Sequence, residues 1–395
     1  MARSDEIIAA SPDLRRLHED GFELAVKQAY LLVLSIPHLT AARTLSRGVL
    51  IFPLTLATDT MAGKPPNHEA YFAGELPHYA DGSPIAGIIN SQGDFKLADS
   101  IVAKFHLSSK PDTPDNNYEV KVRRYVDAIS APARVLFPTA TAQTRMIVEN
   151  EDEDSPFVFQ DTNSARAKIT PITNKLNGLK IAIVGLGGTG SYVLDLVAKT
   201  PVKEIHLYDD DEYSLHNSYR SPGAPTREQL RARMRKVNYL TETYARMHKG
   251  IVPHPVRITA SNVAELAGMS YIFTCIDPGP EKAQVVDFLV NHGIPFSDTG
   301  LGVEIASDRL IGMVNTITVT PHYKGHIHKI PVKGAGSDDL YASNIQIAEL
   351  NMLNAVHAVI RWKKHFGFYA DDRREHECTY TIGPNMLTNE EETGA

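Results

Sequence analysis

The chain has 395 residues, of which 43% are hydrophobic and 22% are charged, as in an ordinary globular protein. The net charge of −7 argues against a nucleic-acid binder that acts by general electrostatics. The cysteines, Cys275 and Cys378, offer neither a disulfide framework nor a Cys-x-x-Cys zinc site, which fits a reducing compartment. The most apolar stretch, 25–36, is too short to span a bilayer. We therefore expect a soluble cytoplasmic protein of two or three domains that does not enter a membrane.

Residues 1–150 are predicted to form a separate α+β domain of unknown function. We expect helices over 1–33 and 118–129, a strand over 48–56, and short strands between 71 and 90. The acidic run 149–154 has the composition of a solvated linker, so we place a linker at 151–168.

From residue 169 onward, short apolar runs alternate with amphipathic segments, which predicts a mostly parallel sheet covered on both faces. Strands are expected at 181–184, 204–208, 251–257, 271–276, 294–298 and 311–319. Helices are expected near 189–200, 226–248, 261–267, 280–292 and 343–366. This α/β domain is predicted to end at residue 382, and 383–395 to be a flexible tail.

A glycine-rich loop follows the first of these strands. Gly185, Gly187 and Gly190 allow a sharp turn and bring backbone N–H groups close to a phosphate at a helix N-terminus. The next strand leads to Asp209, 24 residues after Gly185, where an acid commonly holds a ribose hydroxyl. These features predict a nucleotide-binding β-α-β unit. They fit a dinucleotide as well as a mononucleotide, so an NAD-dependent oxidoreductase remains an alternative.

The residues after Asp209 narrow the choice, because Asn217 and Arg220 suit a site that binds a triphosphate. At this point the sequence resembles the ThiF/MoeB and ubiquitin-activating-enzyme (E1-like) superfamily, from about residue 165 to 365. The matching motifs are Gly185-Leu-Gly-Gly-Thr-Gly190, Asp209-Asp-Asp211, Asn217-Ser-Tyr-Arg220, Lys236 and Cys275-Ile-Asp277.

The resemblance implies a Rossmann-like adenylation domain that uses ATP and Mg2+ to activate the C-terminal carboxylate of a ubiquitin-like protein. The residues that would bind nucleotide are Gly185, Gly187, Gly188, Gly190, Asp209, Asp211, Asn217, Arg220 and Lys236. Among them, Arg220 and Lys236 would neutralise phosphate charge during catalysis. Asp277 would bind Mg2+, and Arg166 stands about where family members have an arginine that reaches a partner subunit.

Two departures from the family pattern leave roles open. Lys236 lies three residues farther from Arg220 than the family places its lysine, so Arg233 competes for that role. Pro278 and Lys282 stand where the family has asparagine and arginine after the metal-binding aspartate. Asp277 could alternatively cap the helix that begins near residue 280.

The segment 322–338, where activating enzymes commonly have a transfer cysteine, contains none. Cys275 is expected to be a buried structural thiol, and Cys378 lies in a polar tail. Either the acyl-adenylate is handed directly to a partner, or a hydroxyl, with Ser337 the best-placed candidate, carries an oxyester.

The expected partners are a ubiquitin-like protein ending in glycine and a conjugating-type protein. A homodimer is expected to form through helices 226–248 and 343–366. The region 1–150 is similar to an uncharacterised domain that precedes ThiF-like domains in some bacterial proteins, which implies docking. A nucleotide-binding scaffold without catalysis is a further alternative. So is activation of a carboxylate on transfer RNA, which the acidic charge disfavours.

Overall fold

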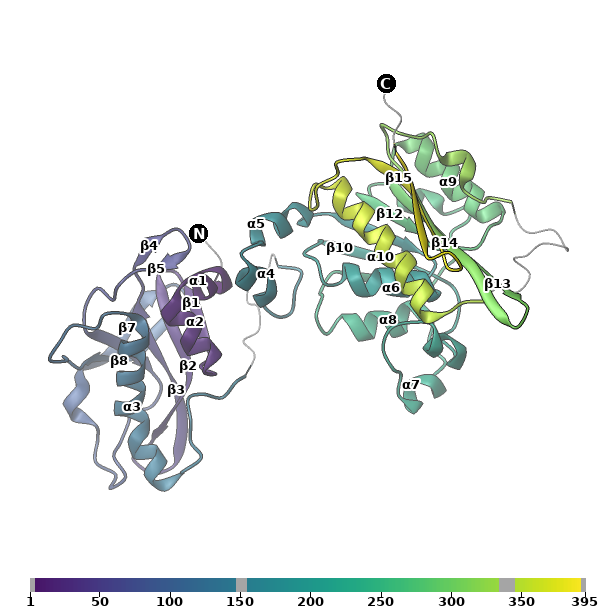
Figure 1. The fold of residues 1–395 in the computed structure, drawn as a ribbon. Helices are drawn as coiled ribbons and strands as arrows, with labels where there is room; N and C mark the ends of the chain where they lie inside the picture. The colour runs from purple at the N-terminus through teal and green to yellow at the C-terminus, as the bar shows by residue number, and fades with distance from the viewer. Residues whose placement is uncertain (1–3, 147–154, 334–344, 392–395) are drawn as a thin grey trace. The chain divides into compact units, whose positions relative to one another are not determined.

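A computed structural model describes residues 4–146, 155–333 and 345–391, which divide into two compact units (Figure 1). The first unit contains residues 4–146 and 159–170, and the second contains 155–158, 171–333 and 345–391. No helix in these ranges is long and apolar enough to cross a membrane.

The first unit is an antiparallel sheet in the order β1-β2-β3-β6-β8-β7 with helices on one face. Its strands are β1 (Leu24–Lys27), β2 (Tyr30–Leu39), β3 (Leu45–Pro53), β6 (Glu69–Ala73), β7 (Ile89–Ala98) and β8 (Ile101–Ser108), with a small pair β4 (Leu56–Thr58) and β5 (Met61–Ala62). Its helices are α1 (Ser4–Ala10), α2 (Pro12–Glu19), α3 (Tyr118–Leu136), α4 (Thr162–Ala167) and the 3-10 turn η1 (Ala86–Ile88). The core forms where α3 places Tyr118 and Tyr125 against Phe52 and Phe72 of the sheet.

The helix predicted over 1–33 is wrong beyond residue 19. Gly21, with φ of 100°, follows the end of α2, and the chain then forms the β1–β2 hairpin. Gln28 and Ala29 both adopt positive φ and make the two-residue turn that pairs Lys27 with Tyr30. Leu31 and Val33 alternate with half-buried neighbours, a period of two that favours a strand over a helix.

The segment predicted as a linker contributes structure to both units. Phe157 is buried and makes a β-bridge with His248 of the second unit. Asp161 accepts a hydrogen bond from the N–H of Ser164 and so caps α4, which contacts α1 in the first unit. Residues 155–170 are therefore folded rather than extended, because these contacts fix them.

The second unit is a mixed α/β fold with a mostly parallel eight-stranded sheet, as predicted. The strand order is β11-β10-β9-β12-β13-β14-β15-β16, in which the first five strands are parallel and the last three are added antiparallel. The strands are β9 (Lys180–Val184), β10 (Glu204–Tyr208), β11 (Ile251–His254), β12 (Tyr271–Thr274), β13 (Phe296–Ala306), β14 (Arg309–Val319), β15 (Glu375–Thr381) and β16 (Met386–Glu391).

Helices cover both faces of this sheet, because successive apolar side chains of the central strand β9 point to opposite faces. Ile181 and Ile183 of β9 pack with α6, α8 and α10, whereas Ala182 and Val184 pack with α9 on the other face. The helices are α5 (Thr170–Thr173), whose first residue belongs to the first unit, α6 (Gly188–Val197), α7 (Arg227–Arg231), α8 (Lys236–Tyr244), α9 (Pro280–His292) and α10 (Ala348–His365). Short 3-10 turns are η2 (Asn174–Leu176), η3 (Leu215–Tyr219), η4 (Val263–Leu266) and η5 (Ile327–Lys329).

Two expectations for this unit need correction. The helix predicted over 226–248 is two helices, because Arg233 has φ of 47° and Arg235 forms a bridge with Glu212 between them. The tail predicted from residue 383 contains β16, whose pairing with β15 extends the sheet through residue 391.

A buried ion pair lies between α9 and β13. Lys282 Nζ is 2.9 Å from Asp298 Oδ1, and the two side chains are 1% and 2% exposed. Thr274 Oγ1 donates to the same carboxylate oxygen at 2.7 Å. Paired charges of this kind are costly to separate, because removing one leaves the other buried without compensation.

We expect Lys282→Met to destabilise the second unit by about 3–5 kcal/mol, because Asp298 would be left buried without its cation. Urea unfolding followed by the fluorescence of Trp362 measures this, since Trp362 is the only tryptophan in the sequence and is buried in this unit. The double variant Lys282→Met/Asp298→Leu should recover part of the loss. A single variant as stable as the wild type would contradict the prediction.

Candidate functional site

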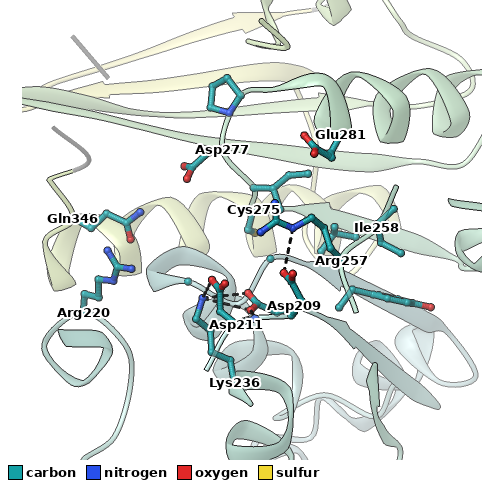
Figure 2. A pocket seen from close by; sticks show the side chains of 17 residues that line it. Asp209, Asp211, Arg220, Lys236, Arg257, Ile258, Cys275, Asp277, Glu281 and Gln346 are labelled. Atoms are coloured by element: carbon teal, nitrogen blue, oxygen red, sulfur yellow. Dashed lines mark hydrogen bonds and ion pairs between the residues drawn. The ribbon is translucent and has the colours of Figure 1, made fainter. Parts of the chain in front are cut away.

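A cavity of about 340 Å³ opens at the carboxyl ends of β9, β10 and β12 (Figure 2). Ligands bind at this edge in parallel α/β sheets, where the strand order reverses. The cavity is lined by Val184, Gly185, Gly187, Tyr208, Asp209, Asp210, Asp211, Arg220, Lys236, Arg257, Ile258, Cys275, Ile276, Asp277, Pro278, Glu281 and Gln346.

The glycines of the loop divide between the cavity and the packing behind it. Gly185, with φ of 90°, lines the cavity, and a Cβ there would lie 2.5 Å from the carbonyl oxygen of Cys275. Gly187 also lines the cavity, and a Cβ there would meet nothing within 4 Å. Gly188 and Gly190 do not line it. A Cβ at Gly188 would meet the Asn351 side chain at 2.1 Å, and one at Gly190 would meet the Gly185 carbonyl oxygen at 1.9 Å. Gly188 and Gly190 therefore let α6 approach its neighbours closely.

Asp209 holds this loop against the end of β10. Its Oδ2 accepts the N–H of Leu186 at 2.7 Å, and its Oδ1 accepts the N–H of Asp211 at 2.9 Å. The Asp209 side chain is 8% exposed. Asp209 therefore fixes the conformation of the glycine loop directly, while its role in binding a ribose stays a prediction.

Lys236 supplies a buried cation to the cavity. Its Nζ lies 2.6 Å from Asp211 Oδ2 and 3.4 Å from Asp209 Oδ1. The hydrogen bond from Lys236 holds the pKa of the Asp211 carboxyl below its usual value. Arg233, the competing candidate, is exposed, pairs with Glu212 at 2.9 Å and does not line the cavity. Between the two, Lys236 is the residue that a ligand in the cavity can reach.

Arg220 and Asn217 have different positions although the sequence groups them. The Asn217 residue is 3% exposed, and its Oδ1 accepts the N–H of Ser214 at 2.9 Å, so it stabilises the η3 turn rather than lining the cavity. The backbone N–H of Arg220 donates to the Asn217 carbonyl at the end of that turn. Arg220 lines the cavity, and its Nε is buried without a hydrogen-bond partner among the described residues. The turn thus presents a cation that an incoming anion can satisfy.

Asp277 lies at the cavity edge just past β12, and it is exposed. The N-cap of α9 is Gly279, so the alternative in which Asp277 caps this helix is wrong. Glu281, in the first turn of α9, also lines the cavity (Figure 2). Lys282, the basic residue five positions after Asp277, is buried against Asp298 and does not line it.

Several lining residues were not identified from the sequence, among them Arg257, Glu281 and Gln346. Arg257 was missed because the strand predicted over 251–257 ends at His254, which leaves Arg257 in the following loop. The remaining predicted residues are Arg166 and Ser337. Arg166 belongs to the first unit, on α4, with its guanidinium 3.9 Å from Glu19, and Ser337 falls outside the described residues.

Neither cysteine has the environment of a nucleophile. Cys275 lines the cavity, and desolvation of its thiol raises the pKa to about 12. Cys378, predicted to lie in a polar tail, is instead buried in β15 because this strand packs under α10, where its Sγ is 3.4 Å from His357 Nδ1. Burial raises the pKa of Cys378 to about 11.

A glycine loop, an acid after the second strand and cations that line the same cavity are the features of a Rossmann-like nucleotide-binding unit. Residues 162–351 match the ThiF family, and this match supports the assignment of that part of the chain to the ThiF/MoeB E1-like superfamily. Residues 12–162 match a domain of unknown function, DUF6791.

Named relatives share only part of their length with this chain. "Adenylyltransferase and sulfurtransferase UBA4" of Saccharomyces cerevisiae is 31% identical over 134 residues, 33% of this chain and 30% of that protein. "tRNA threonylcarbamoyladenosine dehydratase" of Escherichia coli is 29% identical over 129 residues, 30% of this chain and 45% of that protein. A crystal structure of Escherichia coli MccB with MccA has a TM-score of 0.46 and 14% identity, covering 60% of this chain and 74% of that one. The chain thus spans less than half the length of these two curated relatives.

We expect Gly190→Ala to destabilise the second unit by at least about 1–3 kcal/mol, because the new methyl group would overlap the backbone carbonyl of Gly185. Gly187→Ala is the matched control, since that methyl group would meet open space. Urea unfolding followed by Trp362 fluorescence compares the two variants. Equal stabilities would show that the close packing of the loop is unimportant.

We expect both thiols of the folded protein to resist alkylation at pH 8. Because their pKa values are raised to about 12 and about 11, the thiolate is scarce well above the pH at which an ordinary cysteine reacts. Iodoacetamide labelling followed by mass spectrometry measures this, with urea-unfolded protein as the reactive control. Rapid labelling of native Cys275 would contradict the prediction and revive a nucleophilic role.

Proposed function

We propose that the second unit is an ATP-dependent adenylyltransferase that activates the C-terminal carboxylate of a ubiquitin-like protein. The observation that carries the proposal is that one cavity is lined by the cations Arg220 and Lys236, by the glycine loop and by Asp277. Figure 2 shows Arg220, Lys236 and Asp277 around it. The name of the yeast relative supports adenylyl transfer. The ubiquitin-like substrate rests on the superfamily resemblance.

The reaction brings together two anions, a carboxylate and ATP, and this explains why the site needs positive charges. A carboxylate oxygen attacks the α-phosphorus of ATP, the bond from that phosphorus to the bridging oxygen breaks, and pyrophosphate leaves with the electron pair. Negative charge grows on the phosphoryl oxygens, so preorganised cations lower the barrier more than a general base would. Arg220 and Lys236 have this role in our proposal.

Lys236 has to exchange partners for this purpose. In the structure its ammonium group is held by Asp209 and Asp211, so its charge is balanced before a ligand arrives. A triphosphate would compete with the exposed Asp211 carboxylate for this ammonium, while the buried Asp209 stays bound to the loop. Arg220, whose Nε has no hydrogen-bond partner in the part of the chain that the structure describes, needs no such exchange.

Mg2+ would be bound on the opposite wall. Asp277 and Glu281 both line the cavity there, and carboxylate oxygens are the ligands that this hard cation prefers. When bound, the ion would neutralise phosphate charge and orient the leaving group. Asp277 is the metal ligand of the proposal.

The activated carboxylate would pass directly to a partner. Cys275 and Cys378 have raised pKa values, which suits neither to carry a thioester. We therefore propose that the acyl-adenylate is the released or transferred product and that a conjugating-type protein accepts it. Ser337 stays a prediction as an oxyester carrier, and a homodimer stays a prediction for the assembly.

A nucleotide-binding scaffold is the second candidate. It is favoured by one observation, that Lys282 is buried and cannot supply the cation that the family has at this position. An oxidoreductase is less consistent with the cavity, because hydride transfer needs neither Arg220 nor Lys236 beside the loop.

We expect the full chain to catalyse ATP–pyrophosphate exchange that depends on a ubiquitin-like protein with an intact terminal glycine. Asp277→Asn should reduce the exchange rate by about 100-fold or more, because a ligand of the charge-stabilising metal is lost. The matched control is Asp287→Asn, an exposed acid on α9 that does not line the cavity. ATP binding without exchange for any ubiquitin-like candidate would favour the scaffold.

A further inference from the structure

The strand order of the second unit assigns different parts of a nucleotide to neighbouring loops. The glycine loop follows β9, Asp209 follows β10, and Arg257 with Ile258 follows β11. These strands are adjacent in the order β11-β10-β9. Since phosphate binds at the first loop and ribose at the acid of the second, the third loop lies at the end of the cavity where the base projects.

The side chains at this end suit an aromatic ring. Tyr208 and Ile258 line the cavity and are each 2% exposed, and Ile276 adds a half-buried apolar group. Tyr208 and Ile258 also share one apolar cluster, so their positions are fixed by packing. Apolar walls lower the free energy of a planar base more than that of a phosphate.

Arg257 is the one cation among these residues, and an exposed ion pair orients it. Its Nε lies 3.2 Å from Asp210 Oδ1, with the side chains 59% and 43% exposed. Such a surface pair contributes little to stability. It does hold the planar guanidinium of Arg257 at the cavity, which Arg257 and Ile258 both line (Figure 2).

We propose that Arg257 is a base-recognition residue whose guanidinium stacks on the purine ring of the bound nucleotide. A guanidinium presents a flat, weakly hydrated face that stacks on aromatic rings, which a lysine ammonium does not. Asp210 acts as the positioning residue, because it fixes Arg257 through Nε and leaves the plane of the group available. This inference rests on the proposed function, since it presumes that the cavity binds ATP.

Three ligands separate stacking from phosphate binding when they are titrated into the full chain: ATP, AMP and tripolyphosphate. We expect Arg257→Ala to weaken ATP and AMP by the same factor, roughly 3- to 30-fold, and to leave tripolyphosphate unchanged. Arg257→Lys should lose most of the same affinity although it keeps the charge. Isothermal titration calorimetry measures all three dissociation constants.

Arg235→Ala is the matched control. Arg235 donates to the main-chain oxygen of the same Asp210 but does not line the cavity, so its removal should change none of the three affinities. Trp362 fluorescence verifies that each variant is folded.

The pattern of losses decides the outcome. If Arg257→Ala weakened ATP and tripolyphosphate but left AMP unchanged, Arg257 would be a phosphate ligand and the inference would be overturned. Unchanged affinity for all three ligands would also overturn it. If the wild-type chain bound neither ATP nor AMP, the proposed function itself would fail. Loss of binding in the Arg257 variants alone would not have this meaning, because it leaves nucleotide binding by the wild-type chain intact.

Discussion

The site depends on one carboxylate that accepts hydrogen bonds from two backbone segments. Asp209 receives the N–H of Leu186 from the loop after β9 and the N–H of Asp211 from its own turn, and it faces the ammonium of Lys236 from α8. Three elements that are distant in sequence therefore meet at one buried charge. Because a buried carboxylate is stable only when it is hydrogen-bonded and paired, the conformation of the loop and the arrangement of the cavity depend on the same contacts.

This arrangement sets the electrostatics of the cavity. Lys236 and Arg257 are neutralised by aspartates, whereas Arg220 presents a nitrogen that has no partner among the described residues. In the proposed function, a polyphosphate would bind Arg220 directly and would compete with Asp211 for Lys236. The pair between Arg257 and Asp210 would stay intact, because Arg257 would contact the base. The hydrogen bond from the Leu186 N–H to the buried Asp209 holds the loop.

The sequence predicted those parts of the structure that depend on neighbouring residues and missed those that depend on distant ones. The glycine loop, the acid after β10 and the strand–helix alternation are local patterns, and Asp209, which they indicated, lines the cavity. Arg220 and Lys236, which the family resemblance implied, line it as well. Side-chain direction within a turn is not a local pattern, so Asn217 was grouped with Arg220 although it faces inward. Arg257 was missed because its place depends on which strands are neighbours. The β15–β16 hairpin was missed because its polar strands take their stability from pairing rather than from propensity. The β1–β2 hairpin was missed because the apolar run of β2 was taken for part of a helix.

The bridge between Phe157 and His248 has a consequence for how this protein can be divided or recombined. The chain passes between its two units three times: between residues 146 and 155, between 158 and 159, and between 170 and 171. A single cut near residue 150 would deprive the first unit of α4, and a cut near 170 would leave a buried phenylalanine of the second unit on the wrong fragment. Segments of the two units alternate along the sequence, so a recombination event with one crossover cannot exchange either unit for a foreign domain. This order of segments favours inheritance of the two units together.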